Sequence, residues 1–338
     1  MELLETLLTW TDQGWPVAVA TVVADQGSTP RASGAKMLLR GDGESVGTVG
    51  GGLVEARVIE AAARTLAHGR TVLLDFDLGG DLSAGADLIC GGRLTVFLER
   101  IDPHGPADIF RNLAEHLARD ERCVLASPVD GGPRVLLPEQ GPPAGAALPQ
   151  EIMADLRRAG RGLQAPMVFE AEGPWVLEPW ASPAPLYIAG AGHVSQSTAQ
   201  IAAMSGFRVI VMDDRPEFAN SRRFPWASEI STRDMSICLG GRELGPRASV
   251  AIITRGHVHD AAVLAQALRT KAGYIGMIGS RRKRQAIYDL MGRQGFTERD
   301  LARVHCPIGL DIAAQTPEEI AVSIVAELIQ ARAARQAP

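Results

Sequence analysis

From residue 186 onward, short apolar runs alternate with segments whose apolar residues recur at every third or fourth position. The runs predict strands buried on both faces, and the recurring spacing predicts amphipathic helices. The expected strands read LYIA, FRVIVM, VAIIT and YIGMI, and the expected helices read SQSTAQIAAM, HDAAVLAQAL and RRKRQAIYDLM. Strands and helices in this order form βαβ units, so a doubly wound parallel sheet is expected. The sequence Thr316-Pro317-Glu318-Glu319 predicts the start of a final helix through a capping box.

The first 103 residues follow a different order of elements. Leucines at helical spacing predict a helix over Leu3–Asp12, and the apolar run from Trp15 to Ala24 predicts a buried strand. A second helix follows Gly52, and the segments TVLLDFDL and RLTVFLERI predict further strands. Because these strands do not alternate regularly with helices, an α+β domain is favoured.

Residues 104–185 show weaker patterns. A helix is expected near Ile109–Ala118 and a strand near Cys123–Ser127, followed by the stretch PEQGPPAGAALPQ. The proline-containing run Trp175–Pro185 predicts an extended connector. We therefore expect an α/β protein with an α+β domain over residues 1–103, an intermediate region and linker over 104–185, and a Rossmann-like doubly wound domain over 186–338.

The composition is that of an ordinary globular protein. Of the 338 residues, 46% are hydrophobic and 22% are charged, and a chain of this length commonly folds as two domains. The formal net charge of -5 argues against a surface that coats nucleic acid. The first residues are acidic where a signal peptide is basic, and no apolar run is long enough to span a membrane, so a cytoplasmic location is expected.

Three consecutive glycines, Gly50, Gly51 and Gly52, stand directly before the second helix. Backbone N–H groups at a helix start have no partner within the helix and lie at the positive end of its dipole. We therefore expect these glycines to present N–H groups to an anion. Glu55, in the first turn, is an alternative partner for the same groups.

Two more loops of this region carry residues that suit an anion or a metal. The loop GSTPRASGAK offers the hydroxyls of Ser28 and Thr29 and the charges of Arg31 and Lys36, although a proline turn with surface bases has the same composition. In DLICGGR, Cys90 stands beside two glycines and an arginine. Free amides and positive charge lower the pKa of a thiol, and a thiolate binds soft metals, so Cys90 is the predicted metal ligand. The alternative is an inert core cysteine.

The turn GAGHVS follows an expected strand and opens a helix, which is the setting of a dinucleotide-binding fingerprint. Gly190 and Gly192 would let backbone N–H groups approach a phosphate, and His193 would contact the same ligand. Asp213 and Asp214 end the next strand and would accept hydrogen bonds from a ribose. The same glycines also suit simple helix–strand packing, and the same acids suit a solvated strand end.

Another turn, GMIGSRRKR, joins a strand to a helix near Ser280 and Arg281. Backbone amides, a hydroxyl and guanidinium groups together suit a phosphate. Positive side chains are mildly unfavourable at a helix start, so their presence favours an anion site over a solvated helix end.

These segments together resemble the XdhC/CoxI family of accessory proteins for molybdenum hydroxylases. The resemblance rests on GSTPRASGAKM, GTVGGGLVEA, ADLICGGRLTVFLE, GAGHVSQSTAQ, GMIGSRRKR and HCPIGLDIAAQTPEEIAVSI, and it leaves only residues 104–185 unmarked. It implies an N-terminal XdhC/CoxI domain and a C-terminal Rossmann-like domain. It also implies that the protein binds molybdenum cofactor, as molybdopterin or its dinucleotide form, aids its sulfuration with a cysteine desulfurase-type sulfur donor, and delivers it to a xanthine dehydrogenase-type molybdenum hydroxylase apoenzyme.

The resemblance gives the candidate residues specific roles. Gly50, Gly51 and Gly52, with Ser28, Thr29 and Arg31, would hold the phosphate or oxo face of the cofactor. Cys90 would lie near the metal or its exchangeable sulfur. Gly190 and Gly192 would hold a nucleotide portion.

Two other functions stay open. An oxidoreductase that uses NAD(P) or another nucleotide would need the GAGHVS turn with Asp213 and Asp214, but not the loops of the first domain. An interaction scaffold would dock the apoenzyme and the sulfur donor without holding cofactor. The apolar stripe of the first helix suits a homodimer as well as packing within one chain.

Overall fold

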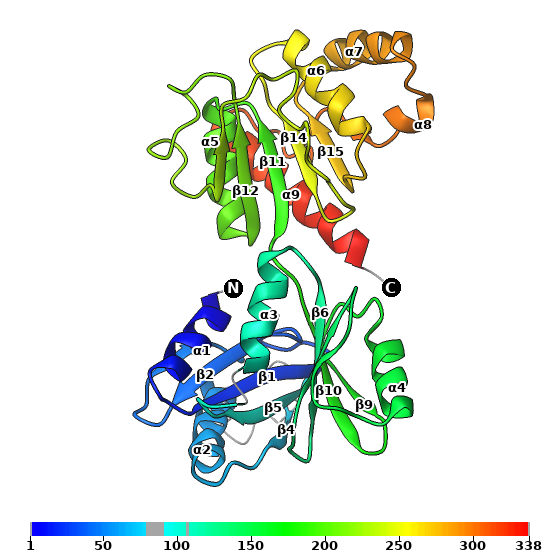
Figure 1. Cartoon of the computed structure of the whole chain (residues 1–338). Coiled ribbons are helices and arrows are strands. Elements are labelled where there is room, and N and C mark those ends of the chain that lie inside the picture. Colours follow the sequence, from blue (N-terminus) through cyan, green and yellow to red (C-terminus); the bar gives the residue numbers. More distant parts are fainter. Residues whose placement is uncertain (1, 79–90, 106–107, 337–338) are drawn as a thin grey trace. The chain divides into compact units, whose positions relative to one another are not determined.

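The computed structural model describes residues 2–78, 91–105 and 108–336. It divides into two compact units, Met1–Ser182 and Pro183–Pro338 (Figure 1). None of the helices in the described part of the chain is both long and apolar enough to cross a membrane.

The C-terminal unit is built on a parallel sheet of six strands in the order β13-β12-β11-β14-β15-β16. The strands are β11 (Ala184–Ala189), β12 (Phe207–Met212), β13 (Glu229–Ser231), β14 (Ser249–Ile252), β15 (Tyr274–Met277) and β16 (Val304–His305). Numbered by their sequence, they follow the order 3-2-1-4-5-6 of a Rossmann fold, which confirms the predicted doubly wound sheet. The order reverses between β11 and β14, where such sheets bind ligands.

Helices cover both faces of this sheet because successive residues of each strand point to opposite sides. Leu186 and Ile188 face α5 (His193–Met204) and α9 (Pro317–Gln336). Tyr187 and Ala189 instead share a core with α6 (His257–Leu268) and α7 (Arg281–Arg293) (Figure 1). A short helix, α8 (Glu298–Leu301), precedes β16. The final helix begins as the sequence predicts, since Thr316 Oγ1 accepts from Glu319 N and the Glu319 carboxylate accepts from Thr316 N.

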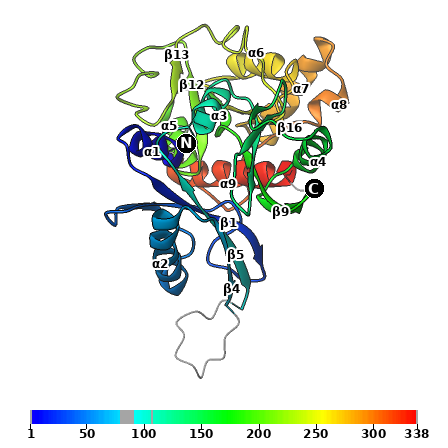
Figure 2. The ribbon, with the colours of Figure 1, turned by 60° about the horizontal axis from the view of Figure 1, so that its bottom comes forward.

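Within its described residues, the N-terminal unit contains two antiparallel sheets of five strands each. The first sheet has the order β3-β2-β1-β5-β4. Its strands are β1 (Val17–Gln26), β2 (Lys36–Arg40), β3 (Ser45–Gly47), β4 (Val72–Asp77) and β5 (Arg93–Ile101). One face packs on α2 (Gly52–His68), and the other packs on α1 (Glu2–Asp12) and α3 (Asp108–Ala118) (Figures 1 and 2). The α+β character expected for this region is confirmed.

The second sheet, with the order β8-β7-β6-β10-β9, is formed by the region whose sequence pattern is weak. Its strands are β6 (Cys123–Pro128), β7 (Val135–Pro138), β8 (Ala144–Gly145), β9 (Met167–Glu170) and β10 (Pro174–Trp180), and α4 (Gln150–Gly160) packs on one face.

The prediction of an extended connector over Trp175–Pro185 is wrong. Residues 174–180 form β10, which pairs with β6 along nearly its whole length, and Trp175 and Leu177 are buried. β9 pairs only with residues 174–177, so Pro179 lies beyond the end of β9. A proline without an N–H is tolerated in a strand where one side has no partner.

Candidate functional site

Three loops of the N-terminal unit touch one another through glycine backbones. A Cβ atom on Gly50 would lie 2.9 Å from Pro30 Cγ, and one on Gly92 would lie 2.5 Å from the carbonyl oxygens of Gln26 and Ser28. Gly50 also has a φ of 144°, which favours glycine. The structure therefore brings together the loop after β1, the turn before α2 and the start of β5.

The loop after β1 is held by its own hydrogen bonds. Asp25 Oδ1 accepts from Ser33 N at 2.8 Å, and Thr29 Oγ1 donates to Arg31 O at 3.1 Å. The side chains of Ser28 and Arg31 are exposed, and that of Thr29 is half-buried. Ser28 and Arg31 are thus presented to solvent beside the glycine turn, whereas the hydroxyl hydrogen of Thr29 is directed to the loop itself.

The Glu55 carboxylate occupies part of the glycine turn. Its Oε1 accepts from Gly51 N at 3.0 Å, from Val49 N at 3.2 Å and from the Thr48 hydroxyl. The hydrogen bond from Thr48, together with those from the backbone, lowers the pKa of Glu55. Glu55 was the alternative partner for the N–H groups of the three glycines, and the structure shows this pairing for Gly51.

The start of α2 still offers backbone donors. Among the described residues, no side chain caps the helix at Gly51, and a Cβ on Gly51 or Gly52 would meet only open space. The first-turn N–H groups from Gly52 onward are left without partners by helix geometry itself. An anion site at this turn would therefore lie at Gly52 rather than at the amides that Glu55 occupies.

Lys36 does not extend this group. Its ammonium pairs with Glu178 Oε2 at 2.7 Å, donates to Thr21 Oγ1 at 3.1 Å and lies 5.1 Å from the centre of the Trp180 ring. The side chains of Lys36 and Glu178 are each only 11% exposed. Lys36 is thus turned into the interior, against the expectation that it adds charge to the anion site.

Cys90 lies outside the described residues, so its role as a metal ligand stays a prediction. Cys123, Cys238 and Cys306 are buried, and burial raises the pKa of each thiol, to about 11 for Cys123 and Cys238. Within the described part of the chain, no three His, Cys, Asp or Glu side chains are grouped so that they could hold a metal ion.

In the C-terminal unit, a cavity of about 330 Å³ lies where the strand order reverses. Gly190 has a φ of 109°, and a Cβ there would lie 2.1 Å from Ile253 O, so only glycine fits. Gly192 is the N-cap of α5, where no side chain caps the helix among the described residues, and His193 is exposed at the first helical position. The cavity is lined by Ala191, Gly192, His193, Val194, Asp213, Arg215, Ile253, Thr254, Arg255, Ile278 and Pro317.

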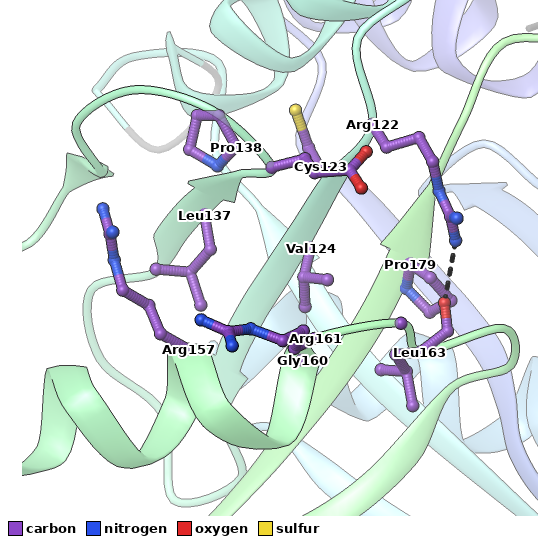
Figure 3. Close-up of a pocket in the computed structure, with 12 residues that line it drawn as sticks. Arg122, Cys123, Val124, Leu137, Pro138, Arg157, Gly160, Arg161, Leu163 and Pro179 are labelled. Atoms are coloured by element: carbon purple, nitrogen blue, oxygen red, sulfur yellow. Dashed lines mark hydrogen bonds between the residues drawn. The ribbon is translucent and has the colours of Figure 1, made fainter. Parts of the chain in front are cut away.

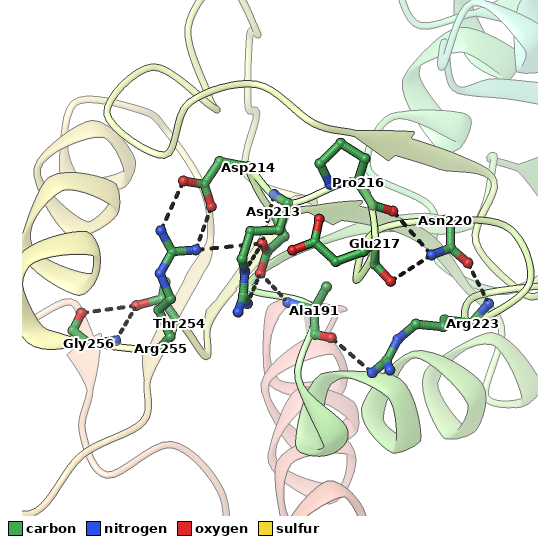
Figure 4. Close-up of polar contacts among 11 residues, drawn as sticks. Ala191, Asp213, Asp214, Pro216, Glu217, Asn220, Arg223, Thr254, Arg255 and Gly256 are labelled. Carbon is green, nitrogen blue, oxygen red and sulfur yellow. Dashed lines mark hydrogen bonds and ion pairs between the residues drawn. The ribbon is translucent and has the colours of Figure 1, made fainter.

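The two aspartates expected to bind a ribose both have partners within the protein. Asp213, which is 3% exposed, accepts from Ala191 N at 2.8 Å and from Arg215 Nε at 2.8 Å. Asp214 accepts from both terminal nitrogens of Arg255, at 2.7 and 3.0 Å (Figure 4). Burial alone would raise the pKa of Asp213, but the hydrogen bonds from Arg215 and Ala191 outweigh it, and the pKa is lowered.

Several polar side chains of the turn between β15 and α7 already have partners within the protein. Ser280 caps the helix by accepting from Lys283 N at 3.2 Å. Lys283 pairs with the fully buried Asp260, and Arg284 donates to Cys306 O at 3.0 Å. Of the residues predicted here, Arg281 is exposed and Ser280 is engaged as a cap.

Sequence reasoning missed Arg215, Thr254 and Arg255, which line the cavity beside the predicted turn. Arg255 and Thr254 follow the end of β14, the strand next to β11 in the sheet. The carboxyl ends of parallel strands share one edge of the sheet, so residues that directly follow an apolar run are candidates for the site. Choosing Thr254 and Arg255 among such residues also requires knowing that β14 lies next to β11.

Two family profiles match the chain. One, described as the XdhC Rossmann domain, matches residues 186–328, and the other, described as the XdhC and CoxI family, matches residues 10–77.

Curated relatives match along nearly the whole chain. Uncharacterized protein YqeB of Escherichia coli is 28% identical over 95% of this chain, which spans only 44% of the length of YqeB. A probable xanthine dehydrogenase subunit of Bacillus subtilis is 28% identical over 93% of this chain and 92% of its own length. Molybdenum cofactor insertion chaperone PaoD of Escherichia coli is 24% identical over 94% of this chain and 84% of its own length.

A solved structure is also similar. It is described as a xanthine dehydrogenase from Bacillus halodurans, and it superposes with a TM-score of 0.82 at 27% sequence identity. The match covers 99% of this chain and 96% of that one.

Proposed function

Because the chain belongs to the XdhC/CoxI family, we propose that it is a maturation factor that binds molybdenum cofactor, supports its sulfuration and delivers it to a xanthine dehydrogenase-type apoenzyme. The relative named as a molybdenum cofactor insertion chaperone supports binding and insertion, and the relative named as part of a xanthine dehydrogenase supports the class of client. The sulfur donor would be a cysteine desulfurase-type enzyme.

The observation that carries the proposal is the meeting of three loops in the N-terminal unit. The cofactor is a pterin with a dithiolene-bound metal and a terminal phosphate, so a carrier needs donors for an anion. The contacts at Gly50 and Gly92 hold the exposed Ser28 and Arg31 near the open start of α2. Backbone N–H groups from Gly52 onward and the Arg31 guanidinium would bind the phosphate or oxo face.

Cys90, which directly precedes Gly91 in the sequence, is the second part of the proposed site. Gly91 N donates to Leu78 O at 3.1 Å, and a Cβ on Gly92 would meet Ser28 O, so the backbone directly after Cys90 reaches the cluster. A thiolate at Cys90 would contact the metal or its exchangeable sulfur.

In the C-terminal unit, the cavity at the reversal of strand order would hold a phosphate-bearing nucleotide portion of a dinucleotide cofactor. The uncapped start of α5 at Gly192 and the guanidinium groups of Arg215 and Arg255 favour negative charge. Asp213 and Asp214 would act there by orienting these arginines, because their carboxylates are already paired with them.

Anaerobic incubation of the full chain with purified molybdenum cofactor, followed by native mass spectrometry, tests the proposal. The parent should retain molybdenum and pterin, and Cys90→Ser should retain less while its circular dichroism stays unchanged. Cys238→Ala, at a buried thiol of the other unit, is the matched control and should retain cofactor like the parent. No retention by the parent would contradict a carrier and favour a scaffold, and equal retention by Cys90→Ser would exclude that thiol.

Delivery and sulfuration need a second measurement. Cofactor-loaded protein, mixed with a xanthine dehydrogenase-type apoenzyme and a cysteine desulfurase, should restore more hydroxylase activity than free cofactor does. An oxidoreductase would instead oxidise NADH in the presence of carbonyl compounds, and we expect no such hydride transfer.

A further inference from the structure

A cavity of about 300 Å³ lies on the second sheet of the N-terminal unit, between β6, β7 and the end of α4 (Figure 3). Its floor is apolar. Val124, Leu137 and Leu163 belong to the hydrophobic core beneath α4, and Pro138 and Pro179 complete the surface. Small-molecule sites commonly combine such a floor with a few polar groups, and their volumes begin at about 300 Å³. The size therefore suits one ring system rather than a dinucleotide.

Three arginines, Arg122, Arg157 and Arg161, surround this floor (Figure 3). Glu139 is the acidic residue among the lining side chains, so three positive charges against one negative charge leave the lining at +2. The lining therefore favours an anionic ligand.

Two of these guanidinium groups are held in place through uncharged oxygen atoms. Arg122 Nη2 donates to Leu163 O at 3.1 Å and to Gln164 Oε1 at 3.4 Å, and Arg157 Nη2 donates to Gly141 O at 3.2 Å. A guanidinium has five N–H donors, so most of them stay available after one or two such bonds. Preorganised guanidinium groups with available donors bind phosphate strongly.

The helix dipole alone does not account for this arrangement. Positive side chains near a helix C-terminus are favourable, and this is sufficient for Arg158, which is exposed and pairs with Asp155 at 2.7 Å. Arg157 and Arg161, four residues apart, lie on the same side of the helix end and line the cavity instead. Gly160 fits between them directly against Val124, since a Cβ there would lie 3.3 Å from Val124 Cγ2.

We infer that this cavity binds a planar heteroaromatic compound that carries one phosphate group, with the ring on the floor of Val124 and Leu137 and the phosphate held by Arg157 and Arg161. The site is separate from the loop cluster and from the cavity of the C-terminal unit. A nucleoside monophosphate and a pterin monophosphate share the required chemistry, so the two sources are separated by experiment.

Isothermal titration calorimetry of the full chain with guanosine 5′-monophosphate, cytidine 5′-monophosphate, a pterin monophosphate and inorganic phosphate tests the inference. At least one ring compound should bind, and inorganic phosphate should bind at least about 10-fold more weakly because it lacks the ring. Arg157→Ala and Arg161→Ala should each raise the dissociation constant about 10-fold. The ring compound that binds more tightly identifies the source.

Arg158→Ala is the matched control, because it removes the same charge from the same turn without touching the cavity, and its dissociation constant should stay within about twofold of the parent value. Methyl NMR locates the ligand, since the Val124 and Leu137 signals should shift on binding. The inference is overturned if no ring compound binds, if Arg157→Ala and Arg161→Ala bind like the parent, if Arg158→Ala loses as much affinity as they do, or if these methyl signals stay unchanged. Retention of molybdenum cofactor by the parent would then still support the carrier function.

Discussion

Asp213 Oδ2 accepts a hydrogen bond from the backbone N–H of Ala191 at 2.8 Å, which ties the end of β12 to the glycine turn after β11. The same carboxylate accepts from Arg215, so the buried acid is surrounded by donors of the protein itself. These hydrogen bonds hold the Asp213 carboxylate in place, and the bond to Ala191 fixes the shape of the glycine turn without a ligand.

Asp213→Asn should lower the free energy of unfolding by about 2 kcal/mol, because it removes the charge from a carboxylate that accepts several hydrogen bonds. Asp214→Asn is the control and should cost less than about 1 kcal/mol, since the pair with Arg255 is more exposed. Urea denaturation of the two variants checks this. Equal losses of unfolding free energy in the two variants would mean that the hydrogen bond to Ala191 does not contribute to stability.

Gly190→Ala and Gly192→Ala should separate folding from ligand binding. The first places a Cβ 2.1 Å from Ile253 O at a positive φ and should destabilise the protein by about 3 kcal/mol or more. The second has open space around its Cβ, so the fold should stay intact while nucleotide affinity falls. Thermal unfolding and nucleotide titration measure the two effects. Unchanged nucleotide affinity in Gly192→Ala would count against a phosphate at this turn.

Glu55→Gln should reduce stability by about 1 kcal/mol near neutral pH, because the N–H groups of Gly51 and Val49 lose their charged acceptor. The pKa of Glu55 is lowered in the folded protein, so its contribution is fully present above the unfolded pKa of about 4.3 and is lost as the pH falls through the lower folded value. The difference between parent and variant should therefore be constant above about pH 5.5 and shrink in acid.

Unfolding curves measured between about pH 3 and pH 7 test this, with Glu60→Gln on the exposed side of α2 as the control. A difference that grows in acid would contradict the assignment.

Glu178→Leu should destabilise the N-terminal unit by about 3–5 kcal/mol, because it leaves the Lys36 ammonium buried without its partner. Burial raises the pKa of Glu178, and the attraction of Lys36 only partly offsets this. The double variant Lys36→Met with Glu178→Leu should recover most of the loss. A double-mutant cycle by chemical denaturation measures the coupling, and additive losses would show that the two side chains do not depend on each other.

Much of the fold could be predicted from local patterns. The alternating runs after residue 186 predict the doubly wound sheet because fully buried strands leave continuous apolar runs. Within residues 104–182 the pattern predicted only the helix α3 and the strand β6, and it missed β8 and β9, which have two and four residues, too few for a pattern. Pro179 also suggested a connector, although the strand continues past the end of β9.

The sequence by itself determined that glycines stand at the turns before α2 and α5. The structure adds the reason at Gly50 and Gly190, where a positive φ and a close neighbour admit no side chain. Only the tertiary structure decided that Glu55 accepts from Gly51, that Lys36 pairs with Glu178 and that Asp213 accepts from Ala191. A charged side chain can satisfy its hydrogen bonds with a ligand or with any neighbouring group, and folding sets which of these lies within reach.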